Sequence, residues 1–229
     1  MSAIDRVRII VLGDSGVGKT SFVHLLTQNE AVRAPGWTVG CSVEVKLHEY
    51  KEGTPEQTSY FIEFWDVGGS RNHRNTRHVF YYPCHGIILV HDLTNRKSEL
   101  NLRKWLQELL SSDTKSAFGN SFDDLDAENF LGSIHIPLLI IGTKLDLVED
   151  NPSSRRSKLA SQFNAEEIVL DCRQSRFLAA GTSNAVKLSR FYDRVIEQSY
   201  HGKDRSYGDK YSYSIQGLPS KFYTPIHQD

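Results

Sequence analysis

Eight residues near the N-terminus have the types and spacing of a phosphate-binding loop. The segment Gly13-Asp14-Ser15-Gly16-Val17-Gly18-Lys19-Thr20 places Gly-Lys-Thr after a first glycine and four variable residues. Glycines let the backbone curl so that its N–H groups point at an anion, while the lysine reaches the β- and γ-phosphates. The threonine hydroxyl would bind Mg²⁺. The predicted phosphate ligands in this segment are Asp14, Ser15, Gly16, Val17, Gly18, Lys19, Thr20 and Ser21.

The flanking residues supply the context that this loop needs. An apolar run at 7–12 predicts a strand before it, and Phe22, Leu25 and Leu26 follow it with helical spacing. The positive end of that helix would attract phosphate. The alternative interpretation is a tight turn between two core elements that binds no phosphate.

Composition predicts a small domain without a strong electrostatic preference. The chain has 229 residues and a net charge of −1, so no overall electrostatic field attracts it to nucleic acid or to a membrane surface. Its longest apolar run is only long enough for a strand. Three widely spaced cysteines without a C-x-x-C motif, in a chain with no predicted signal peptide, indicate reduced thiols and a cytoplasmic protein.

Alternating patterns predict an α/β fold. Strands are expected at 7–12, 42–50, 60–66, 86–92, 137–142 and 167–171, and helices at 20–29, 72–80, 98–112, 153–164 and 184–200. The apolar runs 87–90 and 138–141 are typical of strands covered on both faces. The turn residues 51–55 predict a hairpin. We therefore expect a doubly wound, mostly parallel six-stranded sheet with one antiparallel strand.

Two segments lie outside this pattern of strands and helices. The acidic residues at 113–134 indicate an insertion, either a solvated loop or a surface for a partner. Residues 201–229 are poor in aliphatic side chains and predict a flexible C-terminal tail. The predicted domain therefore covers 1–200.

Three further motifs identify the nucleotide. Asp146, in Thr143-Lys144-Leu145-Asp146, can accept hydrogen bonds from guanine N1–H and the 2-amino group, whereas adenine offers an acceptor at N1. The Lys144 stem would lie along the purine. Asp66 ends an apolar strand and can reach Mg²⁺, and Gly69 can bring its N–H to the γ-phosphate. Thr38 follows Lys19 by nineteen positions and would close over Mg²⁺ when a γ-phosphate is present.

In this order, the motifs resemble those of Ras-superfamily small GTPases, a family of P-loop NTPases. Segments 13–19, 37–43, 51–55, 65–70, 90–95 and 183–191 resemble an atypical Rab-like branch. The resemblance covers 5–199 and implies a G domain that binds GTP or GDP with Mg²⁺, through Thr20, Thr38 and Asp66. It also implies switch segments near 31–45 and 66–82 that bind effectors or regulators, a homodimer, and a role in the prenylation or trafficking of other small GTPases.

The chain departs from the family pattern at four places. Ser70 stands where active members have the Gln that orients the attacking water, so we expect very slow hydrolysis. Thr143 replaces an Asn that bridges the base and the phosphate loop. No S-A-K segment is present; Asp171 and Cys172 are the candidates for the guanine contact it makes, beside Leu145. The chain ends without a lipid-accepting cysteine, which predicts no direct membrane anchor.

Several functions are consistent with this pattern. The first is a nucleotide-dependent switch or scaffold that stays mostly GTP-bound; the second is a cycling GTPase completed by a partner. An ATPase or kinase and a pseudo-GTPase without nucleotide are further alternatives. The basic residues of 71–78 predict either a solvated helix face or a docking face, and Tyr81 and Tyr82 would suit a symmetric interface.

Overall fold

The computed structural model describes residues 4–118, 136–148 and 157–205. Its strands are β1 (Asp5–Leu12), β2 (Cys41–Tyr50), β3 (Thr58–Val67), β4 (Gly86–Asp92), β5 (Leu138–Thr143) and β6 (Glu166–Val169). Its α-helices are α1 (Lys19–Gln28), α2 (Arg96–Phe118), α4 (Lys158–Gln162) and α5 (Ser183–Arg205). Short 3-10 turns are η1 (Arg71–His73), η2 (Arg77–Phe80), η3 (Leu145–Leu147) and η5 (Ser175–Leu178).

The strands form one sheet in the order β2-β3-β1-β4-β5-β6. β2 pairs with β3 in antiparallel orientation, and each of the other neighbouring pairs is parallel. This confirms the predicted mostly parallel sheet with one antiparallel strand. Because β1 lies between β3 and β4, the loop after β1 begins at the centre of the sheet edge, where doubly wound folds bind ligands.

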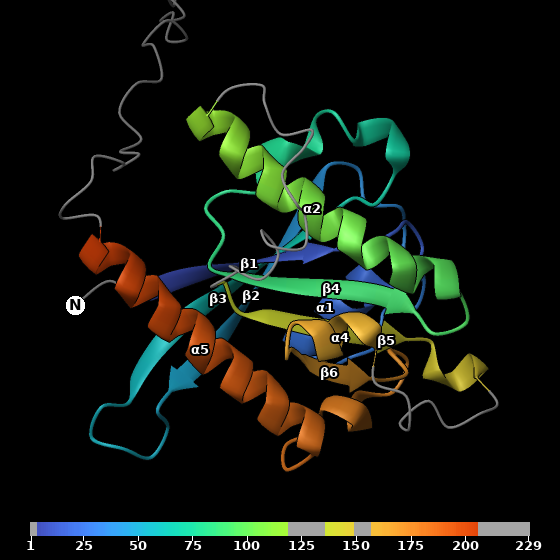
Figure 1. The fold of residues 1–229 in the computed structure, drawn as a ribbon. Helices are drawn as coiled ribbons and strands as arrows, with labels where there is room; N and C mark the ends of the chain where they lie inside the picture. Colours follow the sequence, from blue (N-terminus) through green and yellow to red (C-terminus); the bar gives the residue numbers. More distant parts are fainter. Residues whose placement is uncertain (1–3, 119–135, 149–156, 206–229) are drawn as a thin grey trace, which may run out of the picture.

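Helices cover both faces of the sheet, with α2 and α5 on opposite sides (Figure 1). Alternate residues of β1 divide between the two cores: Ile9 and Val11 pack with α1 and α5, whereas Ile10 and Leu12 pack with α2. All of them are fully buried. Burial on both faces explains why the central strands are continuous apolar runs, and it fixes the strand ends that carry the motifs.

Two helix predictions need correction. The single helix predicted at 72–80 is wrong, because η1 and η2 occupy that region. Its one strongly buried side chain is Arg77, so an ion pair rather than an apolar stripe determines the path of the chain. In 153–164, α4 covers only Lys158–Gln162. Residues 149–156 lie outside the described part of the chain.

The helices beside the insertion and the tail are longer than predicted. α2 continues to Phe118, into the predicted acidic insertion, and α5 continues to Arg205, past the predicted domain end at 200. The rest of the insertion and the tail from 206 lie outside the described residues. Among the helices that the structure describes, none is both long enough and apolar enough to cross a bilayer.

Candidate functional site

The loop after β1 encloses the amine of Lys19. Nζ donates to the carbonyl oxygens of Gly13 and Asp14, both at 3.0 Å, and the residue is 6% exposed. Gly18 has a φ of 94°, and a Cβ on Gly13 would lie 2.2 Å from the Val90 oxygen, so both positions require glycine. Burial lowers the pKa of Lys19, and the charges of Asp66 and Asp14 oppose that shift.

The Asp14 side chain fastens this loop to α2. Its Oδ1 accepts from Trp105 Nε1 at 2.8 Å, and its Oδ2 accepts from Asn101 Nδ2 at 2.7 Å. With both carboxylate oxygens turned to α2, Asp14 can contribute to a phosphate site only through its backbone. Sequence reasoning missed Trp105 and Asn101, although their spacing of four residues on a helix places them on one face.

Three oxygen-bearing side chains meet beside the loop. Asp66 Oδ2 accepts from Thr20 Oγ1 at 2.5 Å and from Thr38 Oγ1 at 3.3 Å, and the two hydroxyl oxygens lie 2.9 Å apart. Asp66 Oδ1 is buried and has no hydrogen-bond partner among the residues that the structure describes. Burial raises the pKa of Asp66, while the Lys19 ammonium opposes the shift. A buried carboxylate with an unused oxygen between two hydroxyls suits Mg²⁺, which prefers oxygen ligands.

Gly69 lies directly against the phosphate loop. A Cβ at this position would come within 2.5 Å of the Ser15 nitrogen and 2.6 Å of the Gly13 oxygen. Only glycine therefore permits this approach. The structure brings Gly69, Ser15, Lys19, Thr20, Thr38 and Asp66 together at the carboxyl ends of β1 and β3, where the sequence predicted a phosphate and magnesium site.

Ser70, next to Gly69, is held by its own segment. Its hydroxyl oxygen accepts from the Asn72 N–H at 3.4 Å and caps η1, and its carbonyl accepts from Arg77 Nη1 at 3.3 Å. Arg77 forms a two-point ion pair with Glu108 of α2, at 2.6 and 2.5 Å. Its guanidinium also lies 3.9 Å from the centre of the Trp105 ring. Trp105 therefore touches both the phosphate loop and the segment that carries Ser70.

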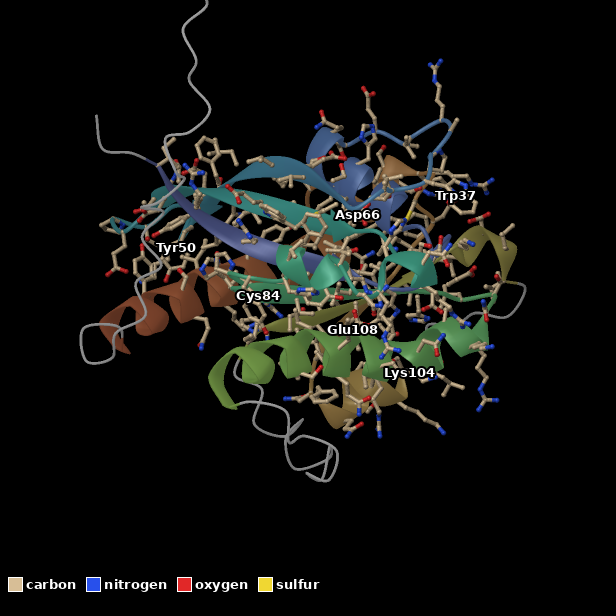
Figure 2. The ribbon with its side chains drawn as sticks, turned by 90° about the horizontal axis from the view of Figure 1, so that it is seen from above. Trp37, Tyr50, Asp66, Cys84, Lys104 and Glu108 are labelled. Atoms are coloured by element: carbon tan, nitrogen blue, oxygen red, sulfur yellow. The ribbon has the colours of Figure 1, made fainter. Side chains whose placement is uncertain are left out.

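The expectation that Tyr81 would suit a symmetric interface is wrong for this conformation, whereas Tyr82 stays partly exposed. Tyr81 is fully buried and donates to Glu108 Oε1 at 2.7 Å, while Tyr82 donates to the Leu109 carbonyl at 2.9 Å. The exposed apolar side chains of the two predicted switch segments include Trp37 at 88%, Val39 at 79% and Val79 at 64%. Figure 2 shows Trp37 near the edge of the molecule and Asp66 nearer its centre.

Thr143 connects the end of β5 to the phosphate loop. Its hydroxyl lies 2.5 Å from the Val17 carbonyl oxygen and 3.0 Å from the His91 carbonyl oxygen. A hydroxyl has one hydrogen, so it donates to only one of them at a time. Lys144, at a left-handed φ of 60°, donates from Nζ to Asp92 Oδ2 at 2.6 Å. Leu145 and Asp146 follow in η3.

The segment after β6 lies beside this loop, and the two together carry the residues predicted to bind guanine. Leu145 N–H donates to the Leu170 carbonyl at 3.4 Å, which joins the two loops. Asp171 and Cys172 are 2% and 9% exposed, and burial raises the pKa of the Cys172 thiol to about 12. The next residue, Arg173, donates to Asp146 and to Asp171. Sequence reasoning missed Arg173; the signal available was a cation two residues after a buried acid.

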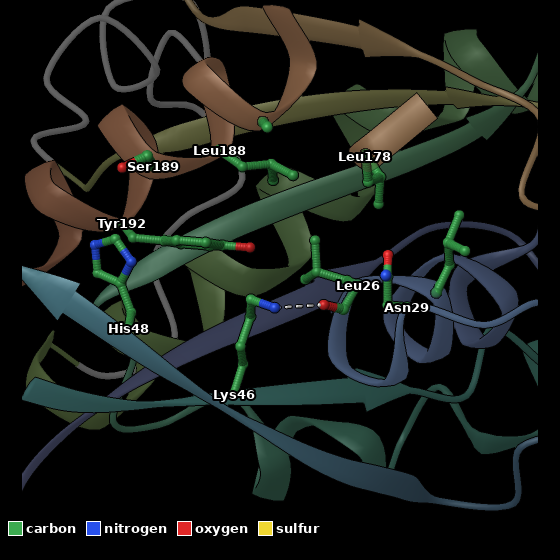
Figure 3. Close-up of a pocket in the computed structure, with 10 residues that line it drawn as sticks. Leu26, Asn29, Lys46, His48, Leu178, Leu188, Ser189 and Tyr192 are labelled. Atoms are coloured by element: carbon green, nitrogen blue, oxygen red, sulfur yellow. Dashed lines mark hydrogen bonds between the residues drawn. The ribbon is translucent and has the colours of Figure 1, made fainter. Parts of the chain in front are cut away.

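A separate pocket lies between α1, β2, η5 and α5. It has a volume of about 170 Å³, and Leu26, Leu188 and Tyr192 form part of its wall. Lys46 Nζ, at its edge, donates to the Leu26 carbonyl at 3.0 Å (Figure 3). None of the predicted nucleotide-binding residues lines it.

Comparisons with known proteins agree with the fold. Residues 8–119 match the family described as Ras of Complex, Roc, domain of DAPkinase. Rab-like protein 3 of Bos taurus is 54% identical over 230 residues, which cover 96% of this chain and 94% of that protein. Rab-like protein 3 of Danio rerio is 50% identical over 233 residues, which cover 96% of this chain and 100% of that protein. Small GTPase LIP1 of Arabidopsis thaliana is 36% identical over 152 residues, which cover 62% of this chain and 42% of that protein.

The mixed sheet and these relatives define a P-loop protein of the Ras-like small GTPases, that is, a GTP-binding switch. Within that class, the chain belongs to the Rab-like protein 3 family.

Proposed function

We propose that this protein is a switch that stays mostly in its GTP-bound form and acts by holding partners rather than by rapid turnover. GTP or GDP would bind with its phosphates in the loop at 13–20 and its guanine at Asp146. Thr20, Thr38 and Asp66 would hold Mg²⁺, which supplies charge neutralisation at the phosphates when it is bound.

The contacts of Ser70 carry this proposal. Its hydroxyl oxygen accepts from the Asn72 N–H, and its carbonyl accepts from Arg77. A serine side chain is also too short to orient a water molecule and contact a γ-phosphate together. Since Ras with its Gln hydrolyses GTP at only about 3–5 × 10⁻⁴ per second, we expect a lower rate here.

Two measurements test the proposal. Chromatography of nucleotide extracted from the purified protein should give GTP or GDP; ATP, or no nucleotide, would contradict guanine binding. Single-turnover hydrolysis of loaded GTP should then be slower than in a Gln-bearing Ras protein. A rate at or above that value would favour a cycling GTPase instead.

The partners in this proposal bind through the switch segments. Trp37, Val39 and Val79 expose apolar surface beside a basic stretch at 71–78, which suits a partner with apolar and acidic side chains. The family resemblance adds other small GTPases, in prenylation or trafficking, and a second copy of this chain as partners. Light scattering with GTP and with GDP tests self-association; a monomer in both would exclude the homodimer.

We also propose a reducing compartment such as the cytoplasm. None of Cys41, Cys84 and Cys172 forms a disulfide within the described residues, which is consistent with a compartment where disulfides do not persist. Fractionation of cells with an antibody against the native chain would test this, and recovery of the protein in a secreted fraction would contradict it.

A further inference from the structure

Three charged side chains meet at the predicted guanine-binding end of the site. Arg173 Nη2 donates to Asp146 Oδ2 at 2.5 Å, and Arg173 Nε donates to Asp171 Oδ1 at 3.3 Å. Asp171 is buried, with its side chain 3% exposed; the Asp146 side chain is 14% exposed, although residue 146 as a whole lies at the surface, and the Arg173 side chain is 69% exposed. One exposed cation therefore bridges two carboxylates whose side chains are less exposed.

The guanidinium of Arg173 offers the same chemistry as guanine. It is a planar group with adjacent N–H donors, and it pairs with carboxylates in the plane. Guanine presents N1–H and the 2-amino group as two adjacent donors to Asp146. A base that makes both bonds must share Asp146 Oδ2 with Arg173 Nη2 or displace it, and either case weakens one of the two interactions.

Asp171 binds the Arg173 side chain but does not need the guanidinium to satisfy its carboxylate. Burial opposes ionisation of Asp171, yet the Arg173 N–H, the Gln174 amide and the Arg173 charge together lower its pKa. The Arg173 N–H donates at 2.9 Å and Gln174 Nε2 at 2.6 Å. Because these two bonds do not involve the guanidinium, Asp171 remains satisfied when the Arg173 side chain moves.

We propose that Arg173 competes with the base for Asp146 and thereby sets how strongly this site prefers guanine. The inference rests on the guanine binding proposed above. Competition for Oδ2 weakens the bond that the 2-amino group would make, so the advantage of guanine over hypoxanthine, which lacks that group, is reduced. Arg173 is thus a specificity-determining residue that acts through Asp146.

The test compares GDP and IDP binding by titration calorimetry for the full chain, Arg173→Gln and Arg176→Gln. Arg176 is an exposed cation on η5, and no hydrogen bond or ion pair to Asp146 or Asp171 is recorded for it within the described residues. Arg173→Gln should bind GDP about two- to fivefold tighter, the range expected for loss of an exposed competing ion pair. Its GDP-to-IDP affinity ratio should rise by a similar factor, which a purely structural residue would not change.

Each other outcome has a definite meaning. Equal or weaker GDP binding by Arg173→Gln, an unchanged ratio, or an equal gain in Arg176→Gln overturns the inference. Arg173→Lys keeps the charge but not the planar donors, so its GDP-to-IDP affinity ratio should lie between those of the wild type and Arg173→Gln. If Arg173→Gln does not fold, the ratio of Arg173→Lys tests the inference in its place. Wild-type protein that binds neither nucleotide contradicts the proposed function instead.

Discussion

The predicted phosphate-binding end of this site (the phosphate end) and its predicted guanine-binding end (the base end) are built differently. At the phosphate end, Lys19 and Asp66 are 6% and 1% exposed and are held by several elements. At the base end, Asp146 pairs with an arginine that is 69% exposed. Enclosed charges lose little of their interaction to solvent, whereas an exposed ion pair is easily exchanged. We therefore expect nucleotide retention to depend on the phosphate end, and the choice of base to depend on exchangeable hydrogen bonds.

Lys19→Asn should give the largest effect, because it removes the ammonium group that the loop encloses. We expect GTP affinity to fall by at least about 1000-fold, since a charge-assisted phosphate contact in an enclosed site is lost. GTP should then no longer raise the melting temperature, because ligand stabilises a fold only by binding it. Lys144→Asn, at the base end, should cost clearly less. Equal losses of GTP affinity in Lys19→Asn and Lys144→Asn would contradict the view that retention depends mainly on the phosphate end.

Asp146→Asn should have the next largest effect. The amide replaces one acceptor by a donor, and an unpaired group in the site costs about 1–3 kcal/mol, so GTP affinity should fall by about 100-fold. Xanthine carries a carbonyl where guanine has its 2-amino group, so XTP should bind the variant better than GTP does. Competition between the two nucleotides measures this; an unchanged preference for GTP would mean that Asp146 does not face the base.

The two ends also differed in how well the sequence predicted them. The phosphate loop is contiguous, and Asp66 ends a clearly apolar strand, so local spacing was enough to bring these residues together. Arg173, Trp105 and Glu108 matter because of contacts across the fold, with partners 27, 91 and 31 positions away. Periodicity cannot show such pairs. It also suggested a helix at 72–80, where the Arg77 ion pair determines the backbone path instead.

Glu108→Gln should lower the stability of the protein, because Glu108 anchors the segment beside the phosphate end. Arg77 loses a charged partner, and a hydrogen bond to a charged group contributes about 1.5–3 kcal/mol, so the free energy of unfolding should fall by about 2 kcal/mol. Burial opposes the charge of Glu108, but bonds from Arg77 and Tyr81 outweigh burial and lower its pKa. Chemical denaturation of wild type and variant at neutral pH measures the loss.

The same ion pair predicts a pH dependence with a definite sign. A carboxylate whose pKa is lowered by folding stabilises the protein above its ordinary pKa, about 4.3 for glutamic acid. That contribution disappears as the pH falls through the lowered value. The wild type should therefore lose stability on acidification below about pH 4.3 more steeply than Glu108→Gln. Glu52→Gln, exposed in the β2–β3 turn, is the control and should follow the wild type.

Thr143→Asn should have the smallest effect and should strengthen the base end. The Thr143 hydroxyl has one hydrogen to share between the Val17 and His91 carbonyls, so it has none left for the base. An amide has two N–H donors and can hold Val17 while it also reaches the base. One added hydrogen bond contributes about 1 kcal/mol, so GDP should bind about fivefold tighter.

Thr143→Val is the matched control for that substitution, because it keeps the shape and removes the hydroxyl. It should weaken GDP binding, since the link between β5 and the Val17 carbonyl is lost. If Asn and Val both leave GDP affinity unchanged, Thr143 does not connect the two ends. Retention of nucleotide would then depend on the phosphate loop and its α2 anchors alone.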